Sequence, residues 1–447
     1  MASFWQRLTK IFSLGGLVFV LASNPALAQQ KQAAAPNTLS RAFMLEILDF
    51  EPYCLQYHKQ ATSDPKRRNL RYFLTQETTS SAFLASNFIL LPEYISNRKT
   101  PDLISNATLK AGYITGLAGS AVGVSSSSIE LASNALAAIK NKKEHRSPKD
   151  YLARLMQHQK TLQNILDQRA ETISSASFDD AKALQQEQEV LRLILARHIY
   201  ECIDAYADAK SYQAGNNSFY AMDISLNACY LASYIVSLQG LSRAEKYGPS
   251  SAIGIAGNGI SMASGPAYTY ITNKLYDHYW KVLEKKIRTP TLDNEKPIYQ
   301  AAAKLKSLLK GDENLRADFF SDWAQNVDTY EAKRLKYLRH VGKIALQSNI
   351  EGPLISGFSM ASSIVNTVGG YRYVDNARRA NNLAISGEIC ELVSNGATFV
   401  LNAQSYWHEA HCDKNLAKKG ESPNQLLASR LSGIERLKEV ILAQDNR

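Results

Sequence analysis

Apolar residues recur along most of this chain at steps of three, four and seven, which is the period of α-helices. The clearest example is residues 147–212. Ser147, Pro148 and Asp150 give a helix start with a capping serine, a proline at the first helical position and an acid three residues after the cap. A second apolar run follows a short polar break at 174–178, so the range predicts an antiparallel helical hairpin with coiled-coil-type packing. Its seam comprises Leu152, Leu155, Leu162, Leu166, Ile173, Leu184, Leu191, Ile194, His198, Cys202 and Ala205.

The same periodicity predicts helices on both sides of this hairpin, while alternating β-type patterns are scarce. These helices cover 40–60, 274–287, 296–310, 315–347, 377–411 and 423–444. The fold class is therefore predicted to be all-α, a multi-helix bundle. We divide the chain into a signal peptide (1–28), a flexible leader (29–39), an N-terminal helical region (40–146), the hairpin (147–212) and a C-terminal helical region (213–447).

Three further segments consist almost entirely of small residues: 111–133, 247–271 and 352–371. Two of them share the tetrapeptide SMAS, at 261–264 and 359–362, which indicates a weak internal repeat. Small residues at such spacings let helices approach closely, although glycine weakens an isolated helix by about 1 kcal/mol relative to alanine. We therefore predict three packing helices. Their contact residues are Gly112, Gly116, Gly119, Gly123, Gly257, Ser261 and Ser359.

Two interpretations of these segments remain open. In the first they are central helices of a bundle in water, with serine hydroxyls bonded to helix carbonyls. In the second they enter a lipid bilayer; their length and scarcity of charge allow this, although their hydropathy is low for ordinary spans. Basic side chains follow all three segments and suit either solvent or anionic headgroups. The expected basic surface comprises Lys140, Lys142, Lys143, Arg146, Lys285, Lys286, Arg378 and Arg379. The first interpretation is favoured.

The first 28 residues have the pattern of a secretory signal peptide. Arg7 and Lys10 precede the apolar run 11–22, and Ala26 and Ala28 form an A-x-A cleavage site. We expect an exported protein, periplasmic or secreted. Residues 1–28 contain two cations and no anion, so cleavage lowers the net charge from +10 to +8. This charge favours an anionic partner, including a membrane surface, and no motif points to nucleic acid.

Few residues form a recognisable chemical motif. The five cysteines leave at least one thiol outside any intramolecular disulfide, and their pairing cannot be deduced from spacing. His408, Glu409, His411 and Cys412 lack the spacing of a zinc protease, and His198 with Glu201 is more typical of a helix seam than of an acid/base pair. We predict no catalytic residue, no metal and no cofactor.

The sequence thus predicts an exported, non-enzymatic helical protein of a bacterial cell envelope, acting as a scaffold or interaction partner. The partner would be another envelope protein or a second copy of the chain. A membrane-inserting or pore-forming protein that uses the small-residue segments is the alternative. An enzyme with an unrecognised site is a third possibility.

Overall fold

The protein is described by a computed structural model that covers residues 35–62, 66–174, 178–287, 290–309 and 314–443. These residues form helices and connecting turns without a β-strand, which confirms the predicted all-α bundle. The expected signal peptide and most of the expected leader lie outside the described residues. The helices are α2 (Pro36–Thr62), α3 (Lys66–Ser96), α4 (Asn106–Lys143), α5 (Pro148–Ser174), α6 (Phe178–Gly240), α7 (Tyr247–Ile287), α8 (Lys296–Leu308), α9 (Asn314–Arg372), α10 (Ala377–Lys418) and α11 (Pro423–Ala443).

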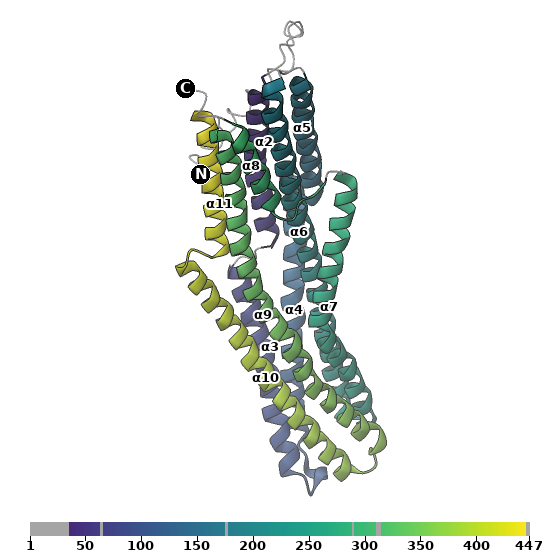
Figure 1. Ribbon diagram of the computed structural model, residues 1–447. Helices are drawn as coiled ribbons and strands as arrows, with labels where there is room; N and C mark the ends of the chain where they lie inside the picture. Colours follow the sequence, from purple (N-terminus) through teal and green to yellow (C-terminus); the bar gives the residue numbers. More distant parts are fainter. Residues whose placement is uncertain (1–34, 63–65, 175–177, 288–289, 310–313, 444–447) are drawn as a thin grey trace, which may run out of the picture.

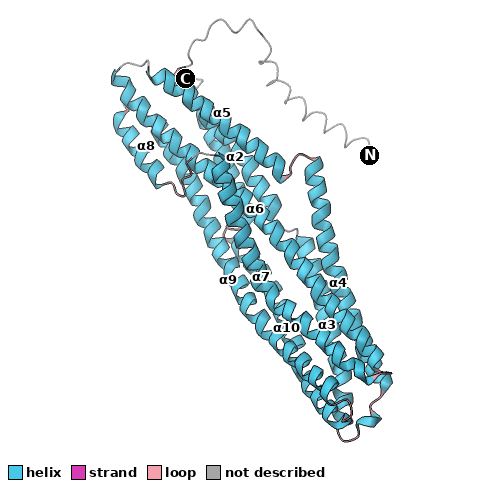
Figure 2. Cartoon of the chain, turned by 90° about the vertical axis from the view of Figure 1, so that its right-hand side faces the viewer, coloured by secondary structure: helices cyan, strands magenta, loops and turns pink. Residues whose placement is uncertain are grey.

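The molecule is elongated and consists of two helical bundles placed end to end (Figure 1). The upper one in that view, called the head, contains α2, α5, α8, α11 and the adjoining parts of α6, α7 and α9. The lower one, called the six-helix bundle, contains α3, α4 and α10 together with residues 211–240 of α6, 247–273 of α7 and 352–372 of α9. Because α6, α7 and α9 run through both bundles, the two parts are joined by continuous helices (Figure 2).

The local signals that start helices are present as predicted. The Asp150 backbone N–H donates to Ser147 Oγ at 3.3 Å, and the Ser147 N–H donates to Asp150 Oδ2 at 3.1 Å, which completes a capping box at the start of α5. Ser422 and Gln425 form a related pair at the start of α11, where the Ser422 hydroxyl donates to Gln425 Oε1 at 2.8 Å. The first turn of a helix leaves its backbone N–H groups without intrahelical partners, and side chains such as Ser147 accept hydrogen bonds from them.

The long helices differ from the predicted boundaries. The leader range overlaps the start of α2, which begins at Pro36, and α6 continues past residue 212 to Gly240 without a break. The ranges 315–347 and 352–371, expected as separate elements, form one helix, α9, with Pro353 inside it. A proline removes one backbone hydrogen bond from a helix, and packing against α7 and α10 holds the two halves of α9 together.

The head has a conventional apolar core. Leu155, Leu162, Leu191 and Ile194 from the predicted hairpin seam are fully buried in it, together with Trp323 of α9. Arg169, whose charge interrupts the apolar seam, is also fully buried. Its guanidinium lies 2.8 Å from Glu187 Oε2 and donates to Ser40, Gln188 and the Leu184 carbonyl, so the buried charge is paired and hydrogen-bonded.

Close backbone contacts organise the six-helix bundle. A Cβ at Gly116 would overlap the Tyr234 ring of α6, and one at Gly119 would lie 2.8 Å from Ala82 Cβ of α3. Helix α4 is therefore held between α3 and α6 by its glycines. At the far end, a Cβ at Gly370 of α9 would overlap the backbone of Gly248 of α7, so these two helices approach to backbone distance.

Candidate functional site

The six-helix bundle is a closed ring of helices. Going around it, α3 packs against α4, α4 against α6, α6 against α7, α7 against α9, α9 against α10, and α10 against α3. The ring surrounds a partly open cavity of about 620 Å³, to which all six helices contribute side chains and which extends to Asp102 and Ala244 at the tip. This volume is within the range of about 300–1,000 Å³ that is usual for small-molecule sites.

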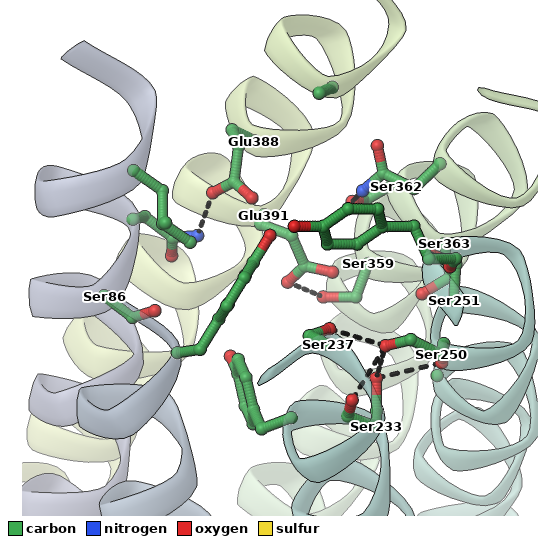
Figure 3. A pocket seen from close by; sticks show the side chains of 18 of the residues that line it. Ser86, Ser233, Ser237, Ser250, Ser251, Ser359, Ser362, Ser363, Glu388 and Glu391 are labelled. Atoms are coloured by element: carbon green, nitrogen blue, oxygen red, sulfur yellow. Dashed lines mark hydrogen bonds between the residues drawn. The ribbon is translucent and has the colours of Figure 1, made fainter. Parts of the chain in front are cut away.

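Serine hydroxyls form much of the cavity wall (Figure 3). Ser250 of α7 lies 3.1 Å from Ser233 and 2.6 Å from Ser237, both on α6, measured between hydroxyl oxygens. The Ser261 and Ser356 hydroxyls are 2.8 Å apart and join α7 to α9. Hydroxyl groups both donate and accept, so this wall offers a polar solute hydrogen bonds of either direction.

Two carboxylates of α10, one helical turn apart, point into the same space (Figure 3). Asn87 Nδ2 of α3 donates to Glu388 Oε2 at 2.9 Å, and the Ser359 hydroxyl of α9 donates to Glu391 Oε2 at 3.1 Å. Asp223 of α6 also lines the cavity, where Ser127 and Gln76 donate to it. In the described part of the chain, the ionisable lining groups are carboxylates and tyrosines, with no lysine, arginine or histidine among them.

The outer surface of the bundle has the opposite character. Long stretches of its helices carry no charged residue: 78–92 of α3, 247–273 of α7 and 352–371 of α9. The corresponding stretches of α4 (111–139) and α6 (211–240) contain one acid each, Glu130 and Asp223, and that of α10 (380–407) contains Glu388 and Glu391. These acids face inward, so the side chains left on the outside of these stretches are uncharged: mostly apolar or small, with a few amides such as Asn217, Gln239 and Gln404.

Large apolar side chains therefore face outward around the ring. They include Phe88 on α3, Ile114 and Ile129 on α4, Ile235 on α6, Leu354, Phe358 and Ile364 on α9, and Ile389 and Val393 on α10, each between 41% and 65% exposed. Isolated exposed apolar residues are ordinary in water-soluble proteins, but a continuous uncharged surface around a polar interior is not.

Among the described helices, one is both long and apolar enough to pass a simple hydropathy criterion for a membrane span: the part of α6 from Ala181 to Gly240. Only 11% of its most apolar window is buried within the chain.

Charged and aromatic residues mark the two ends of the uncharged surface. The turns 97–105, 241–246 and 373–376 meet at the lower tip in Figure 1, and basic residues outnumber acidic ones in and beside these turns. Tyr371 lies near this tip, while Tyr270 and Trp407 lie towards the head; all three are at least 60% exposed. Tyrosine and tryptophan side chains are enriched where proteins cross the boundary between lipid and water.

The residues expected to mediate helix packing all lie in the six-helix bundle. Gly112 faces Leu90 of α3, Gly123 faces Asn227 of α6, and Gly257 faces Tyr230 and Cys229 of α6. Ser261 and Ser359 line the cavity. The expected basic residues are all exposed but do not form one surface. Lys140, Lys142, Lys143 and Arg146 lie at the end of α4, Lys285 and Lys286 at the end of α7, and Arg378 and Arg379 at the tip.

The head contains a second polar cluster, around His198 and Glu201. His198 Nε2 lies 3.0 Å from His158 Nε2. Burial and, secondarily, the neighbouring His158 hold the pKa of His198 well below its usual value, so its imidazole is neutral. Burial raises the pKa of Glu201 to about 8 against the opposing effect of Arg197. The space beside them is only about 30 Å³, enough for about one water molecule.

Two other candidate sites are a histidine group on α10 and a hollow in the head whose lining includes Arg316, Arg430 and Glu187. His408, Glu409 and His411 are exposed on α10, where His411 stacks on Trp407, and no group of metal-ligand side chains forms within the described residues. A hollow of about 1,060 Å³ in the head lies between α2, α9 and α11, beside Phe319 and Phe320. The polar cavity of the six-helix bundle is therefore the candidate functional site.

Sequence reasoning missed the residues that give this cavity its chemistry: Asn87, Glu388 and Glu391. Their one available signal was the spacing of Glu388 and Glu391, which places two acids on one face of an otherwise uncharged stretch. Comparisons with protein-family models, curated proteins and solved structures find no match to this chain.

Proposed function

We propose that the six-helix bundle lies in a lipid bilayer and holds a small polar solute in its central cavity, while the head projects into water. The observation that carries this proposal is the reversed polarity of the bundle. Its cavity is lined by many hydroxyls, amides and carboxylates beside aromatic rings and a small apolar cluster around Leu90, Leu109 and Tyr113, while its outward side chains are uncharged along most of its length. Of the functions open from the sequence, membrane insertion accounts for this arrangement better than an aqueous scaffold does.

The dimensions agree with this proposal. The uncharged part of α9, residues 352–371, is about 30 Å long at 1.5 Å per residue, which matches the hydrocarbon core of a bilayer. The uncharged part of α3, residues 78–92, is shorter, about 22 Å, so Glu77 and Glu93 would lie near the two lipid surfaces. Low hydropathy of the individual segments is expected in a ring whose inner faces are polar, because hydropathy averages the two faces of each helix. Ionisable residues within membrane segments characteristically face the bundle interior, as Glu130, Asp223, Glu388 and Glu391 do.

The orientation follows from the expected export of the N-terminal region, which puts the head on the outer side and the tip in the cytoplasm. The tip then carries Arg98, Lys99, Arg243 and the pair Arg378 and Arg379 in or beside its short loops, as is usual on the cytoplasmic side. The head end of α4 is also basic, with Lys140, Lys142, Lys143 and Arg146, so the orientation rests on export and not on charge.

The lining selects the class of solute. Hydroxyl and amide groups bind neutral polar molecules, and Glu388 and Glu391 add attraction for a cation. An anion would meet carboxylates without a compensating basic side chain among the described lining residues. The proposed ligand is a small neutral or cationic polar solute.

The insertion proposal is tested by fractionating cells that express the full-length chain. We expect the protein in the membrane pellet after washes in high salt and then in alkaline carbonate, because apolar contact with lipid is unaffected by screening. Release by high salt would indicate attachment through basic patches alone. Recovery from the aqueous fraction as a large oligomer would overturn the proposal in favour of a scaffold whose apolar surface is covered by protein.

The solute class is tested by calorimetry on the purified protein in detergent, with tetramethylammonium as a cationic probe and sulfate as an anionic one. At alkaline pH, where both carboxyls are ionised, we expect the wild type to bind tetramethylammonium and not sulfate. Replacing both acids (Glu388→Gln, Glu391→Gln) should weaken binding of the cation at least tenfold, since both charge attractions are lost. Unchanged affinity in this variant would contradict the proposed role of the two acids.

A further inference from the structure

Two cysteines far apart in sequence meet inside the head. Cys54 of α2 and Cys202 of α6 have their sulfur atoms 2.6 Å apart, and their exposed fractions are only 4% and 1%. The other three cysteines lie elsewhere, Cys229 on α6 in the six-helix bundle and Cys390 and Cys412 on α10. Nearest neighbours in sequence are therefore not the residues that come together.

We infer that Cys54 and Cys202 form a disulfide bond that joins α2 to α6 in the exported protein. A disulfide requires two cysteines whose side chains already point at one another, and these two do so across a packed helix interface. Export supplies the oxidising compartment in which such a bond persists. With five cysteines, one bond leaves the remaining three as thiols.

The surroundings support a structural bond rather than a metal site. His198 Nε2 lies 3.8 Å from Cys202 Sγ, and the Tyr151 hydroxyl donates to the Cys202 carbonyl at 2.9 Å. No metal-binding group is formed by these or other described residues. Burial raises the pKa of the Cys202 thiol well above its usual value in the folded head, so the reactive thiolate forms while the two cysteines are still exposed to solvent.

The chemistry is ordinary thiol–disulfide exchange with an external disulfide, for example oxidised glutathione. The Cys54 thiolate attacks one glutathione sulfur, forms a mixed disulfide and releases the first glutathione thiolate. The Cys202 thiolate then attacks Cys54 Sγ and releases the second. Two protein thiols are oxidised, glutathione disulfide is reduced to two thiols, and the protein's two protons neutralise the leaving thiolates. Because both sulfurs are buried, the exchange takes place before α2 closes over α6.

The bond would close a loop from residue 54 to residue 202 that contains α3, α4 and α5. Closing so long a loop restricts the unfolded chain strongly, and this restriction is the main source of disulfide stabilisation in the chain-entropy model. It would also fix α2 to α6 within the head.

The test is to alkylate the exported full-length protein in denaturant without reductant and map the modified cysteines by mass spectrometry. We expect Cys229, Cys390 and Cys412 to be alkylated, and Cys54 and Cys202 to appear as one cross-linked peptide pair that separates on reduction. Alkylation of Cys54 and Cys202, or a cross-link to a different cysteine, would overturn the inference. The result does not depend on membrane insertion, because the chain is denatured before it is mapped.

Matched variants separate the bond from general effects of cysteine replacement. Cys390→Ser should keep the cross-linked pair, whereas Cys54→Ser should leave Cys202 open to alkylation. Reductant should lower the thermal midpoint of the wild type and of Cys390→Ser by several degrees and leave that of Cys54→Ser unchanged. An equal response to reductant in all three proteins would count against a stabilising bond.

Discussion

A lysine placed on the outer surface of the six-helix bundle distinguishes lipid from water around it. Ile364 lies near the middle of the uncharged part of α9 and is 47% exposed. Val282, on the part of α7 that packs into the head, is also β-branched and also 47% exposed. The substitutions Ile364→Lys and Val282→Lys therefore introduce the same charge at positions of equal exposure, one in each bundle.

The expected free-energy changes differ widely. In water, an exposed apolar side chain is replaced by lysine at a cost within about 0.5 kcal/mol, and this applies to Val282. At the centre of a lipid-facing helix, lysine costs about 2.5–3.5 kcal/mol. A difference of about 3 kcal/mol corresponds to a change of about 100-fold in an equilibrium constant. Adding Val393→Lys on α10, also 47% exposed, should roughly double the loss if both side chains face lipid.

The assay measures two properties of each variant: the fraction retained in carbonate-washed membranes and the thermal midpoint in lipid vesicles. We expect Val282→Lys to match the wild type in both, Ile364→Lys to lose retention and stability, and the double variant to fail to insert. If Ile364→Lys and Val282→Lys both behave like the wild type, the outer surface of α9 faces water and the proposed insertion is wrong.

Three further predictions concern packing and buried charge. Gly116→Leu should destabilise the six-helix bundle by about 1–3 kcal/mol because a side chain there overlaps α6, whereas Gly357→Leu, which meets open space, should melt like the wild type. Arg169→Met should lower the free energy of unfolding of the head, measured in urea, by about 3–5 kcal/mol, because the buried Glu187 then keeps only Arg316, at 3.2 Å, as a charged partner among the described residues. Adding Glu187→Leu should restore most of this loss. Burial raises the pKa of Glu201 from 4.5 to about 8, so the folded state holds a proton that the unfolded state releases; the unfolding free energy should fall as the pH rises through this window, and Glu201→Gln should flatten that dependence. A parallel pH profile in the Gln variant would show that another group is responsible.

Features encoded by neighbouring residues could be predicted from the sequence. The capping box of Ser147 and Asp150 needs only a four-residue pattern, and the apolar seam of the hairpin needs only helical periodicity. Helix lengths were less predictable. Pro353 and Gly215 are signals for a break, yet α9 and α6 continue through them because tertiary packing outweighs the local cost.

The cavity could not be predicted because its character depends on which side of each helix faces the ring. Glu388 and Glu391 become a paired lining only when α10 closes against α3 and α9, where Asn87 and Ser359 meet them. Likewise, Ile364 is an ordinary apolar residue in the sequence, and its outward position follows only from the ring. In the structure the small residues of the three segments face the neighbouring helices and the polar cavity, an arrangement that is compatible with a bundle in water and with one in lipid.

The most direct measurement of the central proposal is labelling from within the lipid. The purified protein is reconstituted into vesicles that contain a phospholipid with a photoreactive group at the end of an acyl chain, and the labelled residues are mapped after irradiation. The proposal predicts labels on outward residues such as Ile114, Ile364 and Val393, and none on Val282 or the buried Ser359. Labelling of the six-helix bundle at no more than the level of the head would contradict it.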